Sequence, residues 1–182
     1  MVDAAQAVVA DEDQSRDDFA WFRNNDDAIQ THRDGLTLDA QGLSPFTLGV
    51  AKLLPASNRN AGDAFWVEQT RTVHTPTASA YGVVTASSPD DRVTQLHAGR
   101  LLQRIHLTAT TLGVALHHMN QITERIDAEQ IAGQPATFSP RFATHLPSDA
   151  KPLVAFRVGY PLREARPSPR LPVAAVTQRT PR

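Results

Sequence analysis

The chain has 182 residues, of which 41% are hydrophobic and 20% charged, with a formal net charge of −1 at pH 7. A length near that of one typical domain and an ordinary composition predict a folded chain with its own core. The sequence contains no cysteine, which excludes disulfides, thiolate metal sites and cysteine nucleophiles. No apolar run approaches the roughly 20 residues of a membrane span, so we expect no membrane partner.

The near-zero net charge conceals two oppositely charged ends. Residues 1–20 hold six acidic residues against Arg16, a balance of −5, and residues 151–182 hold seven basic residues against Glu164, a balance of +6. A basic C-terminal segment indicates either an anionic partner or a solvated tail, and the sequence leaves both open. Tyr160 is the only aromatic residue after Phe156 in the sequence. The basic segment therefore offers little for nucleic-acid bases to stack on, and we expect no nucleic-acid partner.

The beginning of the chain is the least regular part. We expect residues 1–14 to be disordered or a frayed helix. Ser15 is typical of an N-cap, and the two aspartates that follow favour the first turn of a helix over about 16–30. Residues 31–43 contain two glycines and few periodic apolar residues, which predicts a loop.

Two further short helices and a strand are predicted next. Ser44 followed by Pro45 is typical of a cap and a first helical position, and the helix should stop at Pro55. Asp63 predicts the start of another short helix. Residues 80–86 are rich in β-formers and have the length of a strand.

A long helix over about 91–117 is the strongest structural signal. Its apolar residues recur at intervals of three or four, which marks one buried helix face. They are Ala98, Leu101, Leu102, Ile105, Ala109, Leu112, Leu116 and Met119. Asp90 and Asp91 precede this segment and indicate helix capping more strongly than a catalytic carboxylate pair.

The rest of the chain predicts two helices, one strand and a tail. The helices are expected at 124–132 and from Ser139, and the strand at 153–159. Prolines beyond Pro161 favour an extended, docked tail, and residues 177–182 are expected to be flexible. The fold class is therefore α+β, helix-rich with a small sheet. Two strands are too few for a normal sheet, so either loops hide further strands or the chain is only part of the fold.

Common catalytic and metal motifs are absent from the sequence. The seven histidines form no HExxH pair, and neighbouring His117 and His118 would diverge on a helix. There is no GxSxG, GxGxxG or P-loop motif. We therefore assign no metal ligand and no catalytic side chain.

The basic tail carries the clearest chemistry. Arg163, Arg166 and Arg170 follow the last strand, with Ser168 between them. Arginine donates two parallel hydrogen bonds to phosphate oxygens, and a serine hydroxyl adds another donor. Prolines between these residues restrict the backbone. The pattern indicates a ligand that carries a phosphate.

Several segments together resemble the FMN-dependent nitroreductases. The strand that ends in Gly159-Tyr160-Pro161, followed by Ser168-Pro169-Arg170, is similar to the C-terminal signature of that family. Residues 99–104 and 110–113 resemble its central helix, and residues 118–121 the turn that lies against the flavin ring. Residues 32–39 are similar to a divergent branch of nitroreductase-like proteins. The resemblance extends from about residue 15 to about residue 176.

The resemblance implies a cofactor, a set of binding residues and partners. Arg170 and Ser168 would bind the FMN phosphate, and Met119, Asn120 and Gln121 would border the isoalloxazine, with a main-chain N–H near its N5 atom. Members of the family are generally homodimers. NAD(P)H reduces their FMN, and a nitroaromatic, quinone or similar acceptor reoxidises it. The nicotinamide stacks on the flavin, so no dinucleotide motif is required.

The sequence also departs from the family pattern. It lacks the arginine-rich opening segment, and Leu171 stands where the second arginine of the tail pair is usual. In the divergent branch it matches the later half of a chain about twice as long. We therefore expect an incomplete nitroreductase-like fold, pairing either as a homodimer or with a nitroreductase-like half.

Two alternatives to an enzyme remain open: a non-catalytic protein that binds or sequesters flavin, and an inactive partial chain. The expected compartment is cytoplasmic, although a longer family member could be exported.

Overall fold

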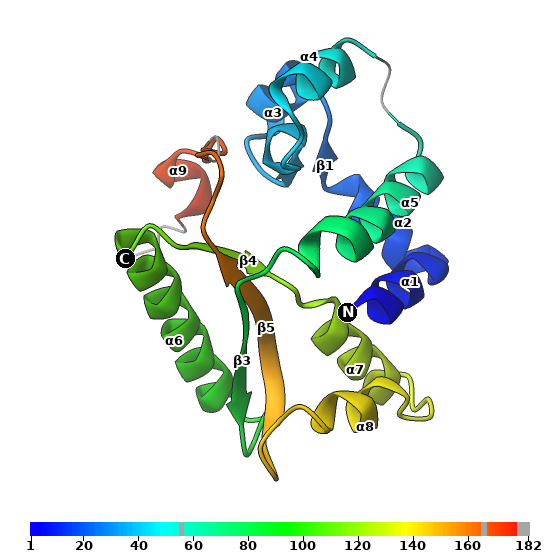
Figure 1. Ribbon diagram of the computed structural model, residues 1–182, viewed down its shortest axis with the longest axis vertical. Helices are drawn as coiled ribbons and strands as arrows, with labels where there is room; N and C mark the ends of the chain where they lie inside the picture. Colours follow the sequence, from blue (N-terminus) through cyan, green and yellow to red (C-terminus); the bar gives the residue numbers. More distant parts are fainter. Residues whose placement is uncertain (55–56, 165–166, 178–182) are drawn as a thin grey trace, which may run out of the picture. The chain divides into compact units, whose positions relative to one another are not determined.

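The computed structural model describes residues 1–54, 57–164 and 167–177. It has an α+β fold in which helices surround small β-sheets, which confirms the expected fold class at this level (Figure 1). Among these described residues, no helix is both long enough and apolar enough to cross a membrane.

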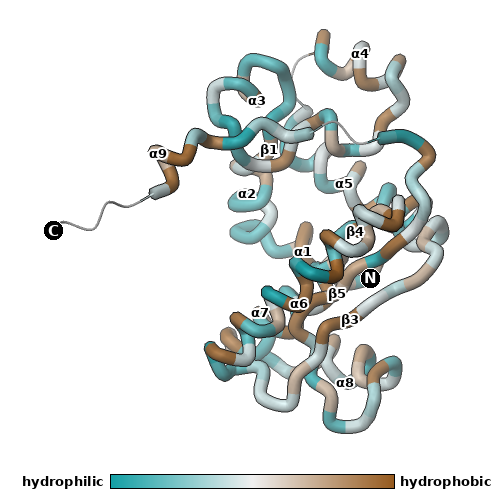
Figure 2. The backbone as a smooth tube through the Cα atoms, turned by 90° about the vertical axis from the view of Figure 1, so that its left-hand side faces the viewer, coloured by the Kyte–Doolittle hydropathy of each residue, from teal (hydrophilic) through white to brown (hydrophobic). Residues whose placement is uncertain are grey.

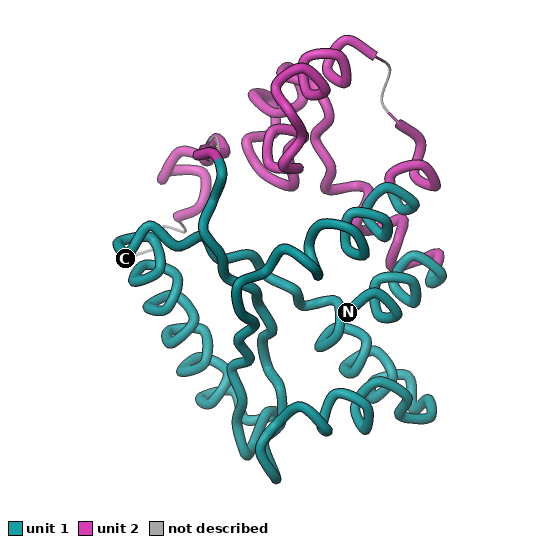
Figure 3. The backbone as a smooth tube through the Cα atoms, viewed as in Figure 1, with its two compact units in different colours: residues 1–11, 63–162 teal, residues 12–62, 163–182 magenta. Residues whose placement is uncertain are grey.

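The chain divides into two compact units (Figure 3). Unit 1 comprises residues 1–11 and 63–162. Unit 2 comprises residues 12–62 and 163–182, of which the described part ends at Thr177. The predicted flexible segment therefore lies almost wholly outside the described residues.

The three-stranded sheet of unit 1 has the order β3-β5-β4, and both pairings are antiparallel. β3 spans Ala80–Ala86 and β5 spans Lys151–Gly159, which confirms the two predicted strands. β4, Ala115–His118, was expected to be helix and is instead the edge strand beside β5. The sheet thus gains a strand from within the segment assigned to the long helix.

The long helix α6 spans Arg92–Thr111 and is capped at both ends. The Asp91 carboxylate accepts a hydrogen bond of 2.7 Å from the Thr94 N–H. At the other end Gly113 adopts a φ of +69°, a left-handed conformation that glycine reaches without strain. The Gly113 N–H donates to the Thr110 carbonyl, and the Val114 N–H donates to the Ala109 carbonyl. These are the two hydrogen bonds of a Schellman motif. The predicted extension to residue 117 is therefore wrong.

Apolar packing covers both faces of β5. On one face, Phe156 packs with Val84 of β3 and Ala98 of α6. On the other face, Ala155 packs with Ala4 and Ile122. Neighbouring residues of a strand point to opposite faces, which accounts for the two clusters. In Figure 1, α6 and α7 lie on opposite sides of this strand.

Three helices surround the second cluster: α1 (Val2–Ala10), α7 (Gln121–Ile131) and α8 (Phe138–Ala143). α1 occupies the stretch expected to be disordered or frayed. Its Ala4, Ala5 and Val8 are buried, so tertiary packing rather than sequence periodicity alone holds this short helix.

α5 (Arg59–Gln69) leads through η2 (Thr70–His74), a π-helical turn, towards β3. The Asn58 side chain caps α5 by accepting from the Ala61 N–H, so the expected cap at Asp63 is wrong. η2 brings Thr70 into a buried position and leaves His74 half-buried.

Unit 2 consists of short elements. The helix predicted over 16–30 is interrupted, because Asn25 accepts from the Ala28 N–H and starts a new helix. Ser15 lies inside a helix and accepts from Arg59. Ser44 caps its helix as predicted, accepting from the Thr47 N–H. The elements are α2 (Glu12–Ala20), β1 (Phe22–Arg23), α3 (Asp26–His32), β2 (Leu36–Thr37), η1 (Leu38–Ala40), α4 (Pro45–Leu53) and α9 (Val173–Val176).

Backbone pairing and ion pairs connect the short elements of unit 2. β1 and β2 pair in parallel, β1 inside the stretch expected to be helix and β2 inside the stretch expected to be a loop. Arg23 forms an ion pair of 2.9 Å with Asp34, and Lys52 forms pairs of 2.5 Å with Asp26 and 2.9 Å with Asp39. The hydrophilic colouring of α2 and α3 in Figure 2 contrasts with the hydrophobic colouring of β5 in unit 1.

Candidate functional site

The turn predicted to border a flavin joins β4 to α7 in unit 1. Met119 and Gln121 are buried there, with 1% and 6% of their surfaces exposed, and Asn120 is half-buried. The Met119 N–H donates to the Ala155 carbonyl at 2.8 Å, which continues the β4–β5 pairing into the turn. The side chains of Met119 and Gln121 are thus packed within the protein, and a ligand at this turn would meet mainly its backbone.

Asn120 fixes the turn to the central strand. Its Oδ1 atom accepts from the Ala155 N–H at 3.1 Å, and its carbonyl accepts from the Thr123 hydroxyl at 2.9 Å. Asn120 occupies the N-cap position of α7 but makes no side-chain capping bond. Because its amide oxygen is engaged by β5, the first amides of α7 are left to other acceptors. A helix start of this kind favours an oxygen or nitrogen acceptor on a ligand.

The predicted phosphate-binding residues lie in the tail of unit 2. Ser168 and Arg170 are exposed and belong to an irregular stretch before α9. In the described part of the chain, Arg170 takes part in no ion pair, so its guanidinium is accessible to an anion. Arg163 donates to the Gly42 carbonyl at 3.2 Å, and Arg166 lies outside the described residues. Residues 160–164 and 167–172 are irregular, and α9 is a helical turn where an extended conformation was expected to the end.

The five predicted cofactor residues therefore form two separate groups. Met119, Asn120 and Gln121 are contiguous in unit 1, whereas Ser168 and Arg170 are neighbours in unit 2. The donors fit the chemistry of FMN: two accessible phosphate donors on the tail and an uncapped helix start at the turn. Within each group the residues are already near neighbours in the sequence.

The sequence interpretation missed a polar cluster on the sheet of unit 1. In register across the three strands, Tyr81 of β3 and His117 of β4 flank Arg157 of β5. Arg157 Nε donates to His117 Nδ1 at 3.0 Å, and Arg157 Nη1 donates to the His74 carbonyl at 2.7 Å and to Thr77 Oγ1 at 3.2 Å. The cluster lies on the sheet face that Ala155 shares, opposite α6.

The histidines of this cluster are held in their neutral form. The His74 and His117 rings meet edge to face with centroids 5.0 Å apart. Loss of hydration, reinforced by the positive charge of Arg157, lowers the pKa of His74 to about 4. Loss of hydration also lowers the pKa of His117 to about 4, with smaller contributions from His74 and Arg157, although the His117 side chain still reaches solvent. Both imidazoles are uncharged at neutral pH.

His118 occupies the opposite face of β4. Its ring lies edge to face with His106 of α6, with centroids 6.2 Å apart, and partial burial lowers its pKa. Strand alternation separates the adjacent histidines, as a helix would also have done, but it places each beside a different histidine partner. The signal that could have revealed β4 is the helix-ending Gly113 followed by alternating side chains.

No group of three or more histidine, aspartate or glutamate side chains in the described residues is arranged to hold a metal ion. Comparison of the chain with family models, curated proteins and solved structures gives no match. The interpretation of the turn, the tail and the polar cluster accordingly rests on their own chemistry and on the sequence motifs that they carry.

Proposed function

We propose that this chain is an FMN-binding oxidoreductase of nitroreductase type, acting in the cytoplasm. It would transfer hydride from NAD(P)H to a nitroaromatic, quinone or similar small acceptor. The observation that carries this proposal is the β4–α7 turn, where Asn120 is turned towards β5 and the start of α7 has no side-chain cap. This geometry occurs at the position where the sequence resembles the flavin-contacting turn.

The chain's own residues would bind and orient the cofactor. Arg170 and Ser168 would donate to the phosphate, and the exposure of both side chains supports this role. The backbone of residues 119–121 would border the ring, since the side chains of Met119 and Gln121 are buried. When bound, FMN supplies the N5 atom that accepts and releases hydride.

Flavin binding and turnover test the proposal in two steps. Incubation with excess FMN should give a yellow protein after desalting, and NADH or NADPH should then be oxidised when a nitroaromatic or quinone acceptor is added. Binding with sustained turnover supports the enzyme. A protein that binds no FMN contradicts the proposed function altogether.

Binding without turnover would identify the second candidate, a flavin-binding protein without catalysis.

Exposed apolar side chains favour a partner-dependent form of either candidate. Leu107 and Leu112 are 58% and 69% exposed at the C-terminal end of α6, and Leu53 of α4 is 87% exposed. Each unit thus exposes large apolar side chains, the kind of surface that interaction sites use. We propose that the chain pairs as a homodimer or with a nitroreductase-like half, which size-exclusion chromatography with light scattering would detect.

A further inference from the structure

The charge of Arg157 is not balanced by a carboxylate within the described part of the chain. All of its hydrogen-bond acceptors are neutral: the His117 ring nitrogen, the carbonyls of Val73 and His74, and the Thr77 hydroxyl. Arg157 is nevertheless half-buried, and loss of hydration lowers its pKa. A guanidinium in this position has given up water without gaining an opposite charge.

Other poorly exposed cations of the molecule are paired differently. Arg23, Lys52 and Arg125 have side chains that are 11%, 16% and 11% exposed, and each contacts an aspartate. Arg157 differs from these three in that all of its acceptors are neutral. Arg59, which is also half-buried and donates to the Ser15 hydroxyl, shares that feature, so the free donor of Arg157 carries the argument.

The hydrogen bonds of the cluster also fix the direction of its donors. Arg157 Nε donates to His117 Nδ1, so that nitrogen carries a lone pair and the proton of neutral His117 is on Nε2. Arg157 Nη1 is occupied by the η2 carbonyls and Thr77, whereas Nη2 has no hydrogen-bond partner among the described residues. Arg157 thus uses Nη1 to hold the η2 turn, and its Nη2 atom is left to donate to another acceptor.

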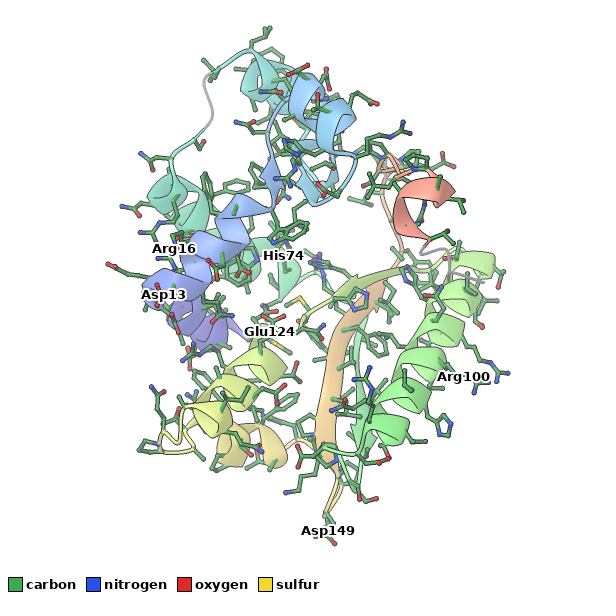
Figure 4. All side chains as sticks on the ribbon, turned by 180° about the vertical axis from the view of Figure 1, so that it is seen from behind. Asp13, Arg16, His74, Arg100, Glu124 and Asp149 are labelled. Atoms are coloured by element: carbon green, nitrogen blue, oxygen red, sulfur yellow. The ribbon has the colours of Figure 1, made fainter. Side chains whose placement is uncertain are left out.

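We propose that Arg157 and His117, with His74 beside them, form a binding site for an oxyanion, either a phosphate or a carboxylate group. Arg157 Nη2 would donate to one of its oxygens, and His117, which accepts from Arg157 Nε, would hold the guanidinium in place, because charge-assisted bonds from a planar guanidinium suit both anions. Tyr81, whose hydroxyl donates to the Thr75 carbonyl, closes the β3 side of the row. Figure 4 shows the placement of His74 and, away from it on α6, of Arg100.

This site is distinct from the tail residues proposed to hold FMN. All of its residues belong to unit 1 and to elements η2, β3, β4 and β5, whereas Ser168 and Arg170 belong to unit 2. Loss of one site should leave the other intact, so the two proposals fail independently.

Histidine side-chain NMR on the full chain tests the site directly. Inorganic phosphate and, in a parallel titration, acetate should saturably shift the His117 and His74 ring signals, and the bound anion should raise the apparent pKa of His117. A stronger response to phosphate assigns the site to phosphate, and a stronger response to acetate assigns it to a carboxylate. Ring signals of both histidines that do not respond to either anion would overturn the proposal.

Matched variants separate binding from a general effect of charge. Arg157→Met should weaken anion binding by about 10-fold or more, the scale of a lost charge-assisted hydrogen bond. Arg92→Met, which removes an exposed arginine at the start of α6, should bind like the wild type.

A second variant guards against misfolding of Arg157→Met. His117→Phe keeps a ring beside His74 but removes the Nδ1 acceptor that orients Arg157, so it should fold and bind the anion several-fold more weakly, as monitored at His74. Wild-type affinity in a folded Arg157→Met or His117→Phe protein would refute the assignment.

Discussion

Two arginines of this molecule are candidates for holding an anion, and they are presented in opposite ways. Arg170 lies on an exposed, proline-rich tail beside Ser168, and its setting is evident from neighbouring residues in the sequence. Arg157 lies in the middle strand of a sheet, where residues 40 and 84 positions away supply its partners His117 and Val73. The first arrangement is local and the second exists only in the folded unit.

This difference predicts different sensitivities. The tail residues are set by the local backbone, so their ability to bind a ligand should not depend on the packing of the sheet. Variants of these residues should alter ligand binding without altering the free energy of unfolding. A cluster built across three strands should depend on the packing of the sheet, and its histidines should couple to folding through pH.

Removing the packing beneath the sheet should have the largest effect. Phe156 is buried between β3 and α6, and its ring lies so close to Gly82 that a Cβ atom there would be 2.2 Å from it. Phe156→Ala should lower the free energy of unfolding by about 3–5 kcal/mol, the usual cost of emptying such a site. Urea denaturation followed by circular dichroism measures this loss.

The matched control for this change is Phe46→Ala. Phe46 is 82% exposed on α4, so its truncation should alter the free energy of unfolding by less than about 0.5 kcal/mol. Equal losses in the two variants would contradict the view that the sheet of unit 1 is the stable frame.

The next prediction concerns the tail. Arg170→Ala should weaken FMN binding by about 1.5–3 kcal/mol, because it removes a charge-assisted bond to the phosphate. The free energy of unfolding in the absence of FMN should not change, since the Arg170 side chain is exposed. Flavin fluorescence titration and urea denaturation provide the two readings. A stability loss with unchanged FMN affinity would make Arg170 a structural residue.

Acid should act on the sheet cluster. The folded pKa values of His74 and His117, about 4, lie below the value of 6.5 usual for exposed histidine, so the unfolded chain binds more protons between these limits. The contribution of these two histidines to the free energy of unfolding is therefore fully present above pH 6.5 and is lost as the pH falls towards 4. After allowance for the solvent access of His117, we expect a loss of about 1–2 kcal/mol.

Denaturation at a series of pH values measures this dependence. The groups that face the His74–His117 pair are Arg157 on β5 and Tyr81 on β3, and His118 acts on His117 electrostatically from the opposite face of β4. His117→Phe should reduce the slope between pH 6.5 and 4 relative to the wild type, which isolates the histidine from carboxylates that titrate nearby. Identical slopes would show that His117 does not couple to folding.

The smallest effect should come from the helix that covers the apolar face of the sheet. Asp91→Ala removes the side-chain cap on the Thr94 N–H and should cost about 1 kcal/mol of unfolding free energy. Asp91→Asn retains a capping oxygen and should restore most of that loss. If Asp91→Ala leaves the free energy of unfolding unchanged, the start of α6 contributes little to the stability of the sheet that carries Arg157.

Local signals made part of the fold predictable. The β-rich composition of residues 80–86, the Ser44-Pro45 cap and the three-to-four periodicity of α6 each act within a few residues, and each gave the right element. β4 was missed because the helical periodicity continued through Leu116, while the Schellman motif at Gly113 had already ended the helix. Residues 1–14 were expected to be disordered or a frayed helix because the packing of α1 against β5 and α7, which holds it, is reported by no local pattern.

The same distinction applies to the sites. Ser168 and Arg170 could be proposed from four residues of sequence, since their shared chemistry is local. The row of Tyr81, Arg157 and His117 could not, because its members become neighbours only through the strand order β3-β5-β4. Strand alternation is predictable once a strand is known, but register between distant strands requires the fold.

An FMN titration of three proteins tests the central proposal most directly. Quenching of flavin fluorescence should be saturable for the wild type, similar for Arg157→Met, and shifted to at least about 10-fold higher concentration for Arg170→Met. That pattern would place the FMN phosphate at the tail and leave the sheet cluster as a separate anion site. A wild-type protein that binds no FMN, or an Arg170→Met protein that binds it as tightly as the wild type, would contradict the account.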